Sequence, residues 1–84
     1  MSISEVEIDA RVEAVAFVGD RLEVSLRDGR TVSAPLSWFP RLAAASPESR
    51  GIWEPCAAGL GIHWPLVDED LSVEGLLHAD APPR

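Results

Sequence analysis

One histidine lies close to three consecutive carboxylates in the last quarter of the sequence: His63 is followed by Asp68, Glu69 and Asp70. An imidazole beside carboxylates can ligate a metal ion, or serve as a general base whose ring a carboxylate orients. His63, Asp68 and Asp70 are therefore the candidate metal ligands. Their spacing matches no known metal-site pattern, however, and a strand would place adjacent carboxylates on opposite faces. We expect structural roles instead, with Asp70 or Ser72 capping a helix, and we predict no cofactor.

The single cysteine, Cys56, is the other residue type that could do chemistry, with His63 or His78 as a base. A thiol nucleophile needs a base within reach and a third group that orients the base. The sequence shows only one cysteine in a predicted loop, which favours a passive thiol in a reducing compartment. It also contains no glycine-rich phosphate loop and no nucleophile elbow. We therefore expect that the protein is not an enzyme and has no catalytic residues.

Aromatic side chains are the third informative group. The chain has three tryptophans, and one of them, Trp38, is followed directly by Phe39. Buried aromatic rings dominate small cores, so a core role is the favoured interpretation. The alternative is that one or two tryptophans are exposed and form a partner hot spot. Acidic residues would then rim that surface and set its specificity: Glu48, Glu54, Asp68, Glu69 and Asp70.

The elements that must position these residues begin with an antiparallel meander of three strands over residues 11–34. Residues 21–27 alternate between apolar and polar side chains, as a half-buried strand does. The register depends on the length of the second turn. A three-residue loop over 27–29 would pair Val24 with Val32 on the apolar face, and would place its glycine at a left-handed position.

The second half of the chain predicts short elements. Ser37 is positioned to cap one short helix, and Ser46-Pro47 is typical of the start of another. After a predicted loop over residues 56–60, residues 61–64 read as a return strand, and Ser72 can cap a final helical turn. The predicted fold class is therefore α+β: an antiparallel β-meander with a short return strand, packed with one or two short helices and a short C-terminal helix.

Length and charge limit the possible functions. The 84 residues fit a single small domain over residues 1–84, with 1–9 as a lead-in or frayed strand and 79–84 as a loose tail. The net charge of −7 repels phosphate backbones and anionic lipids. No apolar run approaches the roughly 20 residues that cross a bilayer. We expect a cytoplasmic protein that binds neither nucleic acid nor membranes, with a charge that serves solubility or favours a basic protein partner.

Several segments of the sequence, taken in order, resemble those of a known protein family. They are the short-strand opening, Leu26-Arg27-Asp28-Gly29-Arg30, the run over residues 35–42, Trp53, and a signature over residues 61–77. Together they resemble a family of small bacterial proteins catalogued only as a domain of unknown function. The resemblance covers nearly the whole chain, although residues 49–51 stand where the family has a more helical, charged run. It implies a small α+β domain with no established activity, some of whose members belong to toxin–antitoxin-like gene pairs.

These observations favour a small non-enzymatic interaction module, and the resemblance suggests the antitoxin-like member of a two-protein pair as its specific form. The predicted partner contacts are Trp38, Trp64, Asp68, Glu69 and Asp70. The alternative is a metal- or small-molecule-binding domain that uses His63 and the acidic triplet. Homodimerisation through a free sheet edge is a further option, because unpaired strand edges invite pairing.

Overall fold

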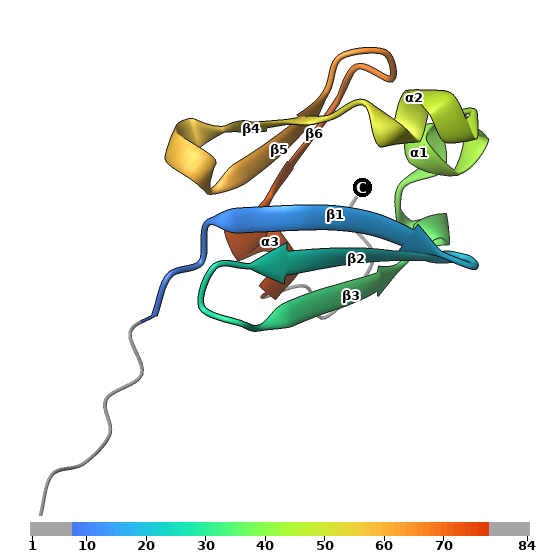
Figure 1. Ribbon diagram of the computed structural model, residues 1–84. Helices are drawn as coiled ribbons and strands as arrows, with labels where there is room; N and C mark the ends of the chain where they lie inside the picture. The colour runs from blue at the N-terminus through green and yellow to red at the C-terminus, as the bar shows by residue number, and fades with distance from the viewer. Residues whose placement is uncertain (1–7, 78–84) are drawn as a thin grey trace, which may run out of the picture.

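Two three-stranded antiparallel sheets face each other in the computed structural model, which describes residues 8–77 (Figure 1). The first sheet contains β1 (Val12–Val18), β2 (Arg21–Leu26) and β3 (Thr31–Pro35) in that order. The second sheet contains β4 (Glu54–Cys56), β5 (Gly61–Trp64) and β6 (Glu69–Ser72), also in chain order. The α+β fold class is therefore confirmed.

Short helices connect and flank the sheets. They are the 3₁₀ turns η1 (Leu36–Trp38) and η2 (Ala57–Gly59), and the helices α1 (Pro40–Ala44), α2 (Pro47–Gly51) and α3 (Val73–Leu77). Figure 1 places α1 and α2 together beside one end of the two sheets. None of the helices within residues 8–77 is long and apolar enough to span a bilayer. The predicted tail over 79–84 and most of the predicted lead-in over 1–9 fall outside these described residues.

The register predicted for the meander is confirmed. Val24 pairs with Val32, and on the other side of β2 it pairs with Val15. Gly29 adopts a φ of 98°, the left-handed conformation that the three-residue turn requires. Most of the large apolar side chains of the three strands therefore reach the same face of the sheet, whereas Val18 at the end of β1 is exposed.

A β-bulge in β1 completes that apolar face. Val12 pairs with Leu26, yet Ala14 already pairs with Ser25, so one extra residue stands in β1 between the two pairs. The extra residue reverses the alternation of side chains. Val12 consequently shares a face with Val15, although their odd spacing would separate them on a regular strand. Val12 is 5% exposed, which shows that the bulge brings it into the core.

The return strand over residues 61–64 forms, but it does not join the meander. It is the central strand of the second sheet, between β4 and β6. Residues 56–60 were expected to form a loop, whereas Cys56 ends β4 and only the rest forms the η2 turn. Pro55 obscured β4 in the sequence, because proline is tolerated in a strand only at a sheet edge, which is where β4 lies.

The predicted helix caps had mixed outcomes. The Ser46 hydroxyl accepts the Ser49 backbone N–H at 3.1 Å, and Pro47 is the first residue of α2, as expected. The prediction that Ser37 caps a helix is wrong. Ser37 lies inside η1, and α1 begins only at Pro40 with Phe39 at its N-cap position and no side-chain cap.

The core lies between the sheets, with Trp64 at its centre. Trp64 is fully buried, and the Phe17 ring of the opposite sheet meets it edge-on at a centroid distance of 6.3 Å. The Trp64 indole N–H donates to the backbone carbonyl of Arg50 at 3.1 Å. The Arg50 guanidinium in turn donates to the carbonyls of Leu42 and Ala43 at 2.7 and 2.8 Å. One arginine thus fastens both short helices to the sheets.

Candidate functional site

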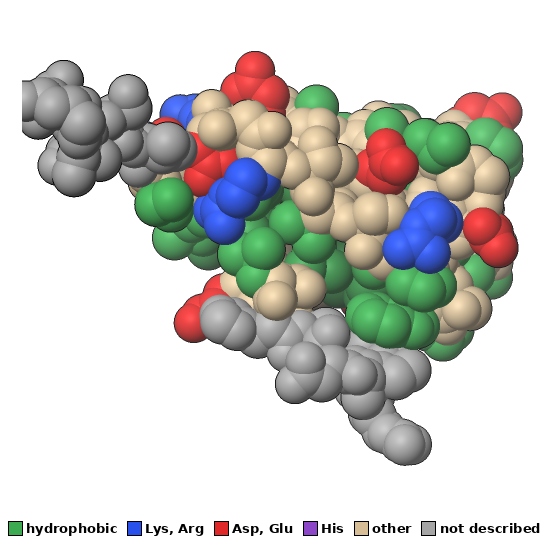
Figure 2. All heavy atoms as spheres, turned by 90° about the horizontal axis from the view of Figure 1, so that it is seen from below, with side chains coloured by type: hydrophobic (Ala, Val, Ile, Leu, Met, Phe, Trp, Pro, Cys, Tyr) green, Lys and Arg blue, Asp and Glu red, His purple; other side chains and the backbone are tan. Residues whose placement is uncertain are grey.

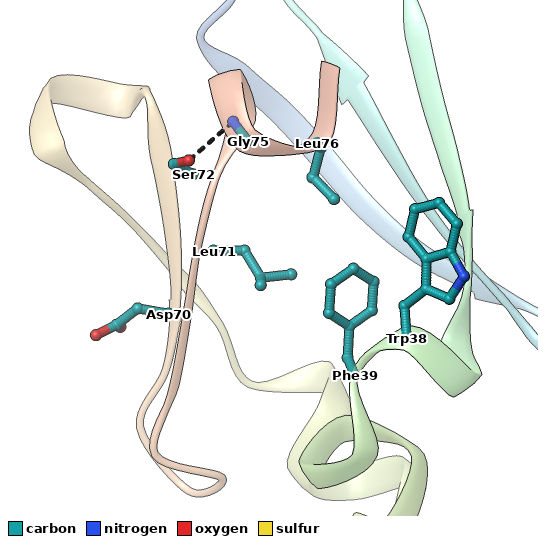
Figure 3. Close-up of a pocket in the computed structure, with 7 residues that line it drawn as sticks. All are labelled: Trp38, Phe39, Asp70, Leu71, Ser72, Gly75 and Leu76. Carbon is teal, nitrogen blue, oxygen red and sulfur yellow. Dashed lines mark hydrogen bonds between the residues drawn. The ribbon is translucent and has the colours of Figure 1, made fainter. Parts of the chain in front are cut away.

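An apolar hollow lies where η1, β6 and α3 meet. It has a volume of about 170 Å³. Figure 3 shows side chains from the three elements converging on it. Trp38 and Phe39 come from η1 and the residue after it, Leu71 from β6, and Leu76 from α3; Asp70, Ser72 and Gly75 complete the lining. The hollow joins segments that lie more than thirty residues apart in the sequence.

The start of α3 fixes one wall of this hollow. The Ser72 hydroxyl accepts the Gly75 backbone N–H at 2.9 Å, as the sequence predicted, and α3 begins immediately after it. A side chain at Gly75 would have its first carbon 2.8 Å from the Ser72 oxygen, so glycine lets the turn close tightly. The cap therefore sets the position of Leu76, one residue further along.

The two aromatic residues form the opposite wall. Phe39 is buried, whereas Trp38 is only partly buried, and their rings meet edge-on with centroids 6.5 Å apart. A partly exposed tryptophan that is held by a buried neighbour presents a large rigid surface at a small loss of conformational entropy. Of the predicted contacts, Trp38 is thus placed where a partner could reach it.

Trp64 is not a partner contact, and that prediction is corrected. Its side chain has no exposed surface, because β5 is the central strand of its sheet and the side chain points toward the other sheet. Its bond to the Arg50 carbonyl also satisfies the one polar atom of the indole. Burial of this kind is the core role that the sequence favoured for tryptophan.

The acidic triplet is divided among three environments. Asp68 lies in the turn before β6 with a φ of 59°, and its side chain is 96% exposed. Its backbone carbonyl accepts the Arg41 guanidinium at 2.7 Å, while its carboxylate lies 3.8 Å from the same group. Glu69 is paired with Trp64 across the sheet, and Asp70 is paired with His63. The triplet therefore forms no single cluster.

His63 lies in a row of polar side chains on the outer face of the second sheet. Glu54 of β4 and Asp70 of β6 are its cross-strand partners. The His63 Nδ1 atom is hydrogen-bonded to the Asp70 carboxylate, as expected for a carboxylate that orients an imidazole. Cys56 lies further along this face. A depression on the face is lined by Cys56 together with His63 and its two partners. Within residues 8–77, no three His, Cys, Asp or Glu side chains are placed to hold a metal ion.

Positive and negative side chains are interspersed on the face of the molecule that Figure 2 draws. Figure 2 shows isolated arginine side chains among acidic ones across the described part of that face, with apolar groups between them. Next to the hollow, a second depression along β6 is lined by Trp38, Phe39, Pro40, Arg41, Glu69, Asp70 and Leu71. The two depressions share Trp38, Phe39, Asp70 and Leu71. Together they form a groove along β6, which we call the β6 groove.

The sequence indicated only part of this groove. Trp38, Glu69 and Asp70 were expected as contacts, and all three line it. Arg41 and Phe39 were not expected as contacts, although both line the groove. The available signal was the spacing of Leu71 and Leu76 on either side of the predicted cap, which indicated a hydrophobic staple. Both leucines pack against the core, yet they also leave the hollow between them and the aromatic wall.

Comparisons with known proteins agree with the resemblance noted from the sequence. A family model described as "Protein of unknown function (DUF2442)" matches residues 12–82. A crystal structure of a protein of unknown function from Rhodospirillum rubrum is 30% identical, with a TM-score of 0.67, over 80% of this chain and 83% of that one. No curated protein matches the chain.

A second solved structure has the same fold. It is the solution structure of an uncharacterised protein from Chromobacterium violaceum, 23% identical with a TM-score of 0.69. The match covers 80% of this chain, but this chain spans only 63% of that protein. The relatives are themselves uncharacterised, so the toxin–antitoxin pairing stays a prediction.

Proposed function

Because the chain belongs to the DUF2442 family of proteins of unknown function, its own surface has to indicate its role, and we propose that it is a small non-enzymatic module that binds a basic protein partner. The β6 groove is the proposed contact surface. Trp38, Glu69 and Asp70 are the contacts kept from the sequence, and Asp68 extends the acidic rim at the hairpin turn. Leu71 joins them as an apolar contact.

The size of the apolar hollow carries this proposal. Pockets that enclose small molecules typically measure roughly 300–1,000 Å³, and this hollow has about 170 Å³. The hollow by itself is therefore suited to one apolar side chain of a larger partner, and the adjoining depression along β6, with about 510 Å³, leaves room for further residues of that partner. A partly exposed tryptophan at its wall is the residue type that most often anchors protein interfaces.

The charge supports a basic partner. The protein has a net charge of −7, and two acidic side chains line the β6 groove against one arginine. Complementary charge raises the rate of encounter and suppresses wrong partners. With the resemblance to members of two-gene pairs, this favours the acidic, antitoxin-like role. The single cysteine of the chain fits a cytoplasmic setting.

Quantitative capture from a lysate of the source organism tests the proposal. Tagged wild-type protein should retain one basic protein in stoichiometric amount, less of it at high salt, because salt screens exposed charges. Trp38→Ala should lose that protein. Leu66→Ala is the matched control, because Leu66 is 62% exposed at the β5–β6 turn and lines neither part of the groove. Equal capture by wild type and Trp38→Ala, or capture of no stoichiometric protein, would refute the proposal.

A further inference from the structure

The two edges of the second sheet differ in how well they are protected. Strand β4 has three residues, and Pro55 is its middle residue. Proline lacks the N–H that a further strand would need, so β4 is a poor template for pairing. Strand β6 forms the other edge and contains no proline. Within residues 8–77, no strand is hydrogen-bonded to the outer side of β6.

The ladder between β5 and β6 shows which backbone groups of β6 are free. The Val73 N–H donates to the Leu60 carbonyl at 2.9 Å, which continues the register that pairs Ile62 with Leu71. In an antiparallel ladder, hydrogen-bonded and non-hydrogen-bonded pairs alternate. Leu71 therefore directs its N–H and C=O toward β5. Asp70 directs both its N–H and its C=O to the open side of β6. Ser72 directs its N–H there, whereas its C=O accepts the first hydrogen bond of α3, because Ser72 is the N-cap of that helix.

The open side of β6 borders the hollow. Asp70, Leu71 and Ser72 all line it, and Figure 3 shows the Leu71 side chain pointing toward Phe39 while Asp70 points the other way. A strand added beside β6 would follow the same alternation of faces. Its side chain next to Leu71 would enter the hollow, and the side chains before and after would lie beside Asp70 and Ser72 on the outer face.

We infer that β6 receives an extended segment of the partner as an additional strand, in which one bulky apolar residue has Arg or Lys as its neighbour at the position beside Asp70. This inference rests on the proposed function and specifies how the partner binds. The N–H and C=O of Asp70 and the N–H of Ser72 supply the hydrogen bonds, the hollow accepts the apolar residue, and the Asp70 carboxylate, 71% exposed, attracts the basic one. Strand addition is a common mode of peptide recognition.

Charge argues for a basic partner over a second copy of the same chain. Two β6 strands placed side by side would bring Glu69 and Asp70 of both copies together, and each copy carries a net charge of −7. Like charges opposite each other destabilise a strand pair. Acidic residues on an edge strand thus discourage self-pairing while they attract a basic segment.

Selection from displayed random dodecapeptides, with the full-length protein as bait, tests the inference. Selected peptides should share an apolar residue with a basic residue next to it, and binding should slow amide hydrogen exchange at Asp70 and Ser72 but not at Leu71. Methylating the peptide nitrogens that face β6 should weaken binding about fivefold or more, because the hydrogen bond to the Asp70 carbonyl is lost. Methylating the alternate nitrogens is the matched control and should leave affinity unchanged.

Three results would overturn the inference. They are the selection of no peptide, equal affinity of the two methylated series, and sedimentation showing that unliganded protein dimerises with slow exchange at Asp70 and Ser72. The capture experiment separates this failure from failure of the proposed function. If Trp38→Ala still abolishes capture of the basic protein, the partner binds at the hollow, but it does not bind as an added strand.

Discussion

Substitution of Gly61 by alanine tests how closely the three strands of the second sheet pack. Gly61 is the middle residue of a row that runs from Cys56 to Ser72 across the outer face. A methyl carbon at this position would lie 2.9 Å from the Cys56 Sγ atom and 3.2 Å from the Leu71 backbone carbonyl oxygen. The first distance is shorter than ordinary van der Waals contact, so the Cys56 side chain or the strand must move.

The expected loss of stability follows from two opposing effects. Overfilling a packed site costs roughly 1–3 kcal/mol. Replacing glycine by alanine lowers the conformational entropy of the unfolded chain, which stabilises the folded protein by about 0.4–1 kcal/mol. The net loss should lie between about 0 and 2.6 kcal/mol, with a central value of roughly 1 kcal/mol. A domain of this length has a total stability of about 4–13 kcal/mol, so the change is large enough to measure by urea denaturation monitored by circular dichroism.

A double-mutant cycle identifies the cause of that loss. Cys56→Ala removes the sulfur atom, so Gly61→Ala should be less destabilising in the Cys56→Ala background, by about 0.5 kcal/mol or more. Gly51→Ala is the matched control, because beyond its chain neighbours and the backbone of its own helix no atom lies within 4 Å of the added carbon there. It should leave the stability unchanged or slightly increased. Equal effects of Gly61→Ala and Gly51→Ala, or no coupling to Cys56, would show that the packing argument is wrong.

Three further predictions concern the core, acid stability and backbone strain. Trp64→Phe should destabilise the protein by about 1–3 kcal/mol in the same assay, because the partly buried Arg50 carbonyl loses its donor; a neutral effect would argue against that bond. The hydrogen bond from the Arg30 side chain lowers the pKa of Asp28, so stability should decrease as the pH falls below about 4, and Asp28→Asn should weaken this pH dependence. Ala58→Gly should raise the melting temperature, because Ala58 has a φ of 58° and glycine adopts that conformation without a steric penalty; an unchanged or lower value would contradict this reasoning.

The meander could be predicted from the sequence because local rules agree there. The turn glycine, the apolar alternation of β2 and the need to keep Val24 and Val32 on one face all select the same register. The helix start at Ser46 was predictable for the same reason, since cap and proline coincide. Where several local preferences favour the same structure, a single sequence is enough to predict that structure.

Two of the three strands of the second sheet, β4 and β6, could not be predicted from local patterns. β4 is three residues long and contains proline, and β6 begins inside an acidic run that looks like a turn. Both are strands because β5 lies between them and provides backbone partners, which is a tertiary effect that overrides propensity. The candidate site depends on the same strands. The sequence marks Asp70 as a candidate, but its pairing with His63 depends on the register of the β5–β6 hairpin. The turn over residues 65–68 sets that register without a glycine, so it lacks the signal that reveals the turns of the meander.

The bulge in β1 has a consequence for how chain length can vary among related proteins. Because Glu13 is the extra residue, its deletion would turn β1 into a regular strand and leave every pair from Ala14 onward intact. Val12 would then stand two positions before Val15, so it would keep its pairing with Leu26 and its inward-facing side chain. A deletion inside β2, which pairs on both sides, would instead disturb two ladders at once. Single-residue gaps in homologous sequences should therefore gather at the start of β1 and avoid β2.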